Sequence, residues 1–189
     1  MVKLITDNFW RYIIVNILLE KERTKKEGLI FKEPEVDDGA EMFRIAKDSK
    51  VLDMNSSYCY LMWSKFFNKT SIIAYEGEEA VGFVSGFIQP ESEDTLFIWQ
   101  IAINSDYRGR GIATKLVTKL LKQLKSEKIR FLEATVTRSN LASSNLFKGI
   151  AEKFNTKYDI KKCFSKEHFP DESSEAEFTY RIGPFQRLT

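Results

Sequence analysis

The clearest chemical pattern lies between Trp99 and Ala113, where an apolar strand and a polar turn lead through Arg108-Gly109-Arg110-Gly111 into an amphipathic helix. Glycines let backbone N–H groups approach a ligand closely, and the first turn of a helix offers unpaired N–H donors at its positive end. Such a turn binds pyrophosphate-like anions, and two arginines add charge-assisted donors. We predict an anion site here; a plain strand–turn–helix with a glycine turn is the alternative.

Two common phosphate-binding motifs do not fit this turn. A P-loop requires Gly-Lys-Ser/Thr, and none follows Gly111. A dinucleotide-binding fingerprint needs a third glycine and a ribose-binding acid at the tip of the next strand. Ala113 could replace that glycine, but the next strand lacks such an acid.

Glu133 is the carboxylate in the least expected place, inside Phe131-Leu132-Glu133-Ala134-Thr135-Val136. A charge in a core-like strand is costly unless it is paired or has a chemical role. Glu133 is therefore a candidate catalytic or ammonium-binding group. The alternative is a structural ion pair with Lys128 or Arg130.

A second polar group lies at Asp53, Asn55, Ser56 and Tyr58. One carboxylate with several neutral donors suits a ligand that carries ammonium and carboxylate groups together. The alternative is an ordinary helix cap at Asp53 or Asn55, with Tyr58 and Tyr60 in the core.

The composition narrows the function classes. The chain has 189 residues, and 29 Lys and Arg against 27 Asp and Glu give a net charge of +2. This near balance argues against a nucleic-acid binder. The single histidine, His168, excludes a multi-histidine zinc site, and Cys59 and Cys163 fit neither a disulfide framework nor a metal pair. We expect a cytoplasmic protein without a metal or a nucleic-acid partner.

Residues 1–28 differ from the rest of the chain. Their apolar run, residues 12–19, is far shorter than the roughly 20 residues of a membrane helix, and no small-residue cleavage site follows it. We predict an N-terminal extension of unknown role at 1–28, one domain at 29–189 and no membrane partner.

Helical and extended patterns alternate through the rest of the chain, which predicts an α+β domain whose most apolar strand, 96–103, is central. In the helix at 111–127 the apolar residues recur at the spacing of one helix face. The segment 155–175 is polar and mixed, and is predicted to be a loop. The other expected elements are helices near 37–50, 58–68 and 140–154, and strands at 71–76, 80–89, 130–137 and 178–182.

Arg108-Gly109-Arg110-Gly111-Ile112-Ala113 resembles the Q/R-x-x-G-x-G/A acetyl-CoA motif of the GNAT acetyltransferases. Further blocks resemble the L-2,4-diaminobutyric acid acetyltransferases of ectoine biosynthesis, in the order of that family; they are residues 52–61, 81–85, 94–100, 131–137 and 180–184. Two positions depart from the pattern. Phe147 stands where many GNAT enzymes have a tyrosine general acid, and Ser174-Glu175 stands where the family often has His-Glu.

The resemblance implies a GNAT-like fold, an α+β three-layer arrangement with a mixed, mainly antiparallel sheet flanked by helices. It implies acetyl-CoA as co-substrate and no metal. Backbone groups would contact pantetheine and polarise the thioester carbonyl, the glycine turn would hold the diphosphate, and two side chains beyond it would add contacts. These cofactor-binding positions are Ile101, Ala102 and Ile103, then Arg108, Gly109, Arg110, Gly111, Ile112 and Ala113, then Asn140 and Ser144.

The resemblance also implies acetylation of the γ-amine of L-2,4-diaminobutyrate by a homodimer. Glu133 would be the catalytic residue, as an ammonium partner or a base acting through water. The substrate-binding positions implied are Asp53, Asn55, Ser56, Tyr58, Trp99, Glu133 and Glu177. Three alternatives stay open: a GNAT enzyme for another small amine, one for a protein amine, and a non-catalytic acyl-CoA sensor.

Overall fold

The computed structural model describes residues 15, 28–49, 55–170 and 175–186. Their strands form one seven-stranded sheet in the order β1-β2-β3-β4-β5-β7-β6. The strands are β1 (Ile30–Lys32), β2 (Ser71–Glu76), β3 (Glu79–Gln89), β4 (Ser92–Ile103), β5 (Phe131–Thr137), β6 (Tyr158–Phe164) and β7 (Glu177–Ile182). The helices are α2 (Asp38–Ser49), α3 (Ser57–Phe66), α4 (Ile112–Gln123) and α5 (Leu141–Lys153).

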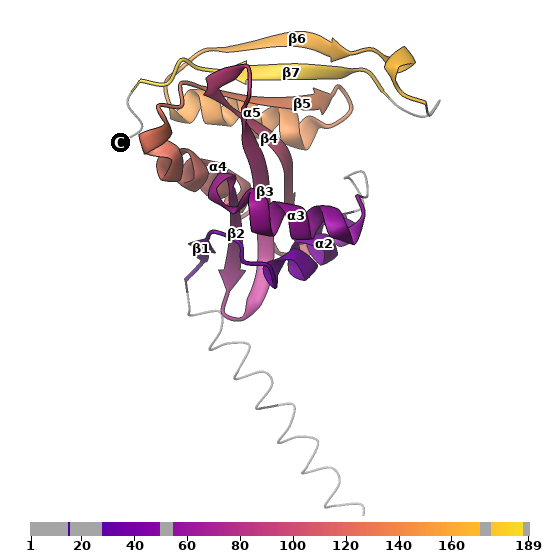
Figure 1. The fold of residues 1–189 in the computed structure, drawn as a ribbon, viewed down its shortest axis with the longest axis vertical. Coiled ribbons are helices and arrows are strands. Elements are labelled where there is room, and N and C mark those ends of the chain that lie inside the picture. The colour runs from indigo at the N-terminus through magenta and orange to yellow at the C-terminus, as the bar shows by residue number, and fades with distance from the viewer. Residues whose placement is uncertain (1–14, 16–27, 50–54, 171–174, 187–189) are drawn as a thin grey trace, which may run out of the picture.

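Two hydrophobic cores place helices on both faces of the sheet. One contains Leu116 and Leu120 of α4 with Phe147 and Ile150 of α5. The other contains residues of α2 and α3, among them Tyr60. Figure 1 shows α2 and α3 lying together, and the layer of β5, β7 and β6 running across the top with α5 beneath it. This arrangement confirms the predicted mixed, mainly antiparallel sheet between helices.

The only parallel pair in this sheet of the described chain, β4 with β5, is short. It joins Thr95–Phe97 to Phe131–Glu133. Beyond Phe97, β4 continues to Ile103 without a described β5 partner, although β3 still pairs its other edge. The two strands therefore splay apart in the middle of the sheet and leave a backbone edge of β4 open.

A β-bulge at Trp99 marks the start of the splay. Ser85 pairs with Gln100 and Gly86 pairs with Ile98, so that Trp99 is the extra residue of β4. The bulge inverts the alternation of the strand: Ile98 belongs to the α4/α5 core, whereas Ala102 belongs to the α2/α3 core. It thus decides which β4 side chains face each half of the site.

Gly86 is needed opposite this bulge, because a Cβ there would lie 2.5 Å from the carbonyl oxygen of Phe97. We expect Gly86→Ala to lower the free energy of unfolding by about 1–3 kcal/mol, as overpacking does. Gly149→Ala is the matched control, since its Cβ would meet nothing within 4 Å in helix α5. It should be neutral or stabilise by up to about 1 kcal/mol in urea unfolding. Equal stability of the two variants would contradict the role given to Gly86.

The prediction of a loop at 155–175 was wrong, because β6 and a 3₁₀ turn at Lys166–His168 lie within it. Every residue of β6 is exposed, since this strand is the edge of the sheet. An edge strand without a buried face lacks the apolar alternation by which strands are found. The short strand β1 was also not predicted.

Among the described residues, no helix has the length and apolar character to cross a membrane. The boundary predicted after residue 28 stays a prediction, because most of 1–28 lies outside the described residues.

Candidate active site

A cavity of about 410 Å³ lies along the open edge of β4, between the glycine turn and α5. It is lined by three consecutive β4 residues, by the turn that leads into α4, and by the first turns of α5. The lining residues are Ser49, Ile101, Ala102, Ile103, Tyr107, Arg108, Gly109, Gly111, Ile112, Ala113, Asn140, Ala142, Ser143 and Leu146. These include most of the positions predicted to bind the cofactor.

The glycine turn exposes backbone donors to this cavity. Gly109 and Gly111 have φ angles of 76° and 71°, in the left-handed region that favours glycine. Gly111 is also the N-cap of α4, and no side chain caps the helix there. The N–H groups of the first turn of α4 therefore remain for a ligand at the positive end of the helix dipole.

The two arginines of the turn have different surroundings. Arg108 lines the cavity, where its Nε donates to the carbonyl of Ile103 at 3.2 Å. Arg110 does not line it; its guanidinium pairs with the buried carboxylate of Glu76 and lies 5.1 Å from the ring centroid of Tyr107. The charge of Arg110 thus fastens the turn to β2, and its side chain is not placed as the phosphate donor that the sequence suggested.

Asn140 serves as a helix cap and also borders the cavity. Its side-chain oxygen accepts from the backbone N–H of Ser143 at 3.0 Å. Ser144 is buried outside the cavity and is hydrogen-bonded to the hydroxyl of Tyr180 at 2.9 Å. Ser143, one position earlier, lines the cavity instead. Phe147 is buried and its ring centroid lies 6.3 Å from that of Tyr180.

Glu133 lies on the opposite side of the splay, facing away from the α4/α5 core. Its Oε2 accepts from Nε2 of Gln89 at 2.7 Å, and its Oε1 accepts from Nη1 of Arg181. The ion pair that the sequence raised as an alternative does exist, but its partner is Arg181 of β7. Lys128 and Arg130 were the wrong partners; Arg130 pairs with Asp94 at 3.9 Å.

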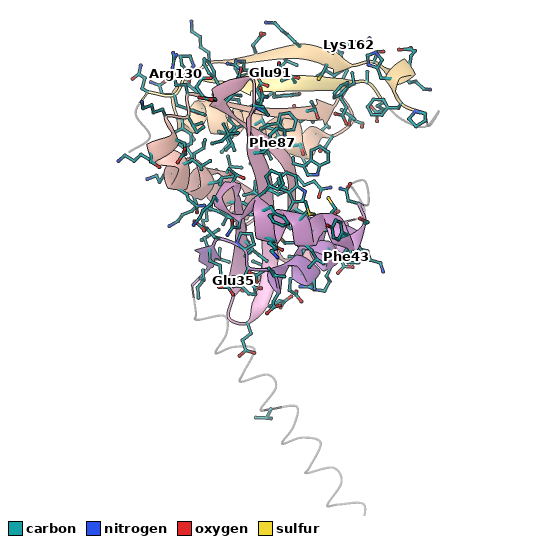
Figure 2. All side chains as sticks on the ribbon, in the orientation of Figure 1. Glu35, Phe43, Phe87, Glu91, Arg130 and Lys162 are labelled. Atoms are coloured by element: carbon teal, nitrogen blue, oxygen red, sulfur yellow. The ribbon has the colours of Figure 1, made fainter. Side chains whose placement is uncertain are left out.

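Aromatic rings extend from Glu133 along the same side. Phe97 is in register with Glu133, and we call Phe97, Phe87, Trp63 and Trp99 the aromatic wall. Their centroids are 5.2 Å apart for Phe87 and Phe97, 6.5 Å for Trp63 and Phe87, and 6.0 Å for Trp63 and Trp99. Trp99 is 47% exposed, so this wall borders open space. Figure 2 shows Phe87 between the β5–β7 layer and the α2–α3 layer.

The polar cluster before α3 is only partly described. Asp53 lies outside the described residues. Ser56 is the N-cap of α3, although its side chain makes no capping hydrogen bond, so the cap suggested at Asn55 is not the one used. Tyr60 is buried as expected for a core residue, whereas Tyr58 is 67% exposed and free to contact a ligand.

Glu177 begins β7, opposite Thr137 at the far end of β5. It is half-buried and shares the β5–β7 pairing that brings Arg181 to Glu133. Among the described residues, no group of His, Cys, Asp and Glu is arranged to hold a metal ion.

The fold and the cavity indicate an enzyme class that a family model also matches. The model described as the acetyltransferase (GNAT) family covers residues 39–150, which include the open β4 edge, the glycine turn and the start of α5. The chain therefore belongs to the acetyltransferase (GNAT) family. A solved ribosomal-protein-S18-alanine N-acetyltransferase from Escherichia coli shares this fold, with a TM-score of 0.62 at 14% identity.

Within that family, the chain is one of the L-2,4-diaminobutyric acid acetyltransferases. It is 45% identical to that enzyme from Marinococcus halophilus, over 85% of this chain and 93% of the relative. It is 45% identical to the Shouchella clausii enzyme, over 90% of this chain and 96% of that relative. The diaminobutyrate acetyltransferase of Paenibacillus lautus, solved with L-2,4-diaminobutyric acid and coenzyme A, superposes with a TM-score of 0.81 at 38% identity, covering 85% of this chain and 97% of that one.

Proposed function

We propose that this chain transfers an acetyl group from acetyl-CoA to the γ-amine of L-2,4-diaminobutyrate, which gives Nγ-acetyl-L-2,4-diaminobutyrate for ectoine biosynthesis. One observation carries the proposal. The splay between β4 and β5 has the glycine-turn cavity on one side and Glu133 with the aromatic wall on the other. A donor and an acceptor can thus approach the same gap from opposite faces.

The cavity suits coenzyme A on the evidence of its own residues. The glycine turn and the uncapped start of α4 would bind the diphosphate, with Arg108 as the nearest cationic side chain. The open edge at Ile101–Ile103 would pair with the amide groups of pantetheine, as a neighbouring strand would. When bound, acetyl-CoA supplies an acyl group activated as a thioester.

The acceptor amine must lose a proton before it can attack, because an amine of this kind is an ammonium with a pKa of about 10. Glu133 is the described carboxylate at the start of the splay, so it would bind the ammonium or accept its proton through a water. The proton would then pass from this side of the splay to solvent.

Selection of the γ-amine requires that the α-amino acid end be held away from the gap. Trp99 is exposed on this side, Tyr58 is exposed on α3, and Asn55 and Ser56 precede that helix. With Glu177 and Asp53, these residues would contact the zwitterionic end of the substrate, and the aromatic wall would contact its methylene groups.

Release of coenzyme A thiol provides the first test of the activity. We expect thiol release from acetyl-CoA with L-2,4-diaminobutyrate that is at least roughly 100-fold faster, as kcat/KM, than with a lysine-containing peptide. Polar groups placed for one substrate discriminate strongly against an analogue that leaves them unpaired. Preference for the peptide would favour a protein acetyltransferase, and coenzyme A binding without any turnover would favour a sensor.

We also propose that the enzyme is a cytoplasmic homodimer. The family resemblance supports this.

A further inference from the structure

Glu133 is held by side chains from two other strands. Gln89 of β3 donates to one carboxylate oxygen and Arg181 of β7 donates to the other. The carboxylate side chain of Glu133 is only 15% exposed, so these contacts leave it little freedom to rotate. A carboxylate held in this way can contact a substrate from one direction only.

Arg181 reaches Glu133 from the end of the strands where β4 and β5 are still paired. Its guanidinium carbon lies 3.8 Å from the ring centroid of Phe131, and its Nη1 also lies 3.4 Å from Oγ1 of Thr95. Thr95 and Phe131 are partners in the β4–β5 pairing, on the side of Glu133 that is away from the splay. Arg181 therefore supports the carboxylate from behind and leaves its other side toward the gap.

The neighbouring charges do not compete for this contact. Asp159 of β6 is in register with Arg181, but Lys161 already lies 2.9 Å from its carboxylate. Arg130 also lies over the ring of Phe131, at 5.5 Å, but its ion-pair partner is Asp94. Among the described residues, Glu133 is thus the carboxylate that the Arg181 guanidinium contacts.

We propose that Arg181 is a positioning residue that acts through Glu133 and aims its carboxylate at the acceptor amine. A guanidinium stays protonated, so Arg181 itself neither gives nor takes a proton during the reaction. Its contribution is orientation, and small misplacements of a reacting group can cost about 100-fold in rate. This inference rests on the proposed function, because it requires that Glu133 serves the amine.

A double-mutant cycle on kcat/KM for diaminobutyrate tests the proposal. We expect Arg181→Met to lose roughly 10- to 100-fold, with the KM for acetyl-CoA within about twofold of the wild-type value. In a Glu133→Gln background the same change should cost less than about threefold, because the group that it positions is gone. The cycle is repeated with Arg181→Lys, which keeps the charge without the planar guanidinium. The loss of kcat/KM in this variant should be smaller than in Arg181→Met, and it should also vanish in the Glu133→Gln background.

Arg130→Met is the matched control, since it removes the other guanidinium that lies over the ring of Phe131. Its kcat/KM should stay within about twofold of the wild-type value. Figure 2 marks the position of Arg130 at the edge of the β5–β7 layer. A loss that persists undiminished in the Glu133→Gln background, or full activity in both Arg181 variants, would overturn the role of Arg181 alone. A wild-type chain without turnover would overturn the proposed function and this inference together.

Discussion

Replacing Glu133 with Gln should lower kcat/KM for diaminobutyrate by roughly 100- to 1000-fold, within the range that general acid–base groups contribute. The glutamine keeps the size of the side chain and can still accept from Arg181, so the fold should survive. It cannot accept a proton or neutralise an ammonium. The measurement is steady-state kinetics with both substrates varied, together with the thermal midpoint of unfolding.

The control for this prediction is Glu93→Gln, which changes an exposed carboxylate in β4. It should retain wild-type kinetics. The affinity for coenzyme A should be unchanged in both variants, because the cavity lies across the splay from Glu133. Wild-type kcat/KM in Glu133→Gln would show that its ion pair with Arg181 is structural only.

Gly111→Val should reduce the affinity for coenzyme A by at least about 30-fold. The φ of 71° at Gly111 is strongly unfavourable for a β-branched residue, so the turn must change and the N–H groups at the start of α4 lose their direction. Each hydrogen bond to a charged group contributes about 1.5–3 kcal/mol, so loss of one or two accounts for this magnitude. Calorimetric titration with coenzyme A measures the change.

Gly111→Asn separates backbone conformation from side-chain bulk. Asparagine tolerates the left-handed region, and a Cβ at this position would meet nothing within 4 Å. This variant should therefore bind coenzyme A more tightly than Gly111→Val by about tenfold. If both variants bind as weakly as each other, the left-handed conformation is not what matters at Gly111.

Local patterns in the sequence predicted the strand, the turn and the helix that border the cavity, but not that Arg110 and Ser144 lie outside its lining. The buried face of α4, with Ile112, Leu116 and Leu120, has helical spacing, and the glycines before it mark the turn. Both signals lie within one continuous segment. The two hairpin strands at 71–76 and 80–89 were likewise predicted to within one residue of their ends, because polar turn residues bound them.

Features that depend on the pairing of distant strands were not predictable from one sequence. Arg181 and Glu133 are 48 positions apart in the sequence. They meet only because the antiparallel pairing of β5 and β7 places them in register. Arg110 meets Glu76 through a contact from the glycine turn to β2, which also joins residues far apart in the sequence. The bulge at Trp99 leaves no composition signal either, although it inverts the faces of β4 and exposes this tryptophan to the acceptor side.

The open β4 edge and the glycine turn together should form a coenzyme A site. Calorimetric titration of the wild-type chain with coenzyme A measures this binding. We expect saturable binding at one site per chain that weakens strongly in Gly111→Val and is unchanged in Glu133→Gln. Absence of binding by correctly folded wild-type protein would contradict it.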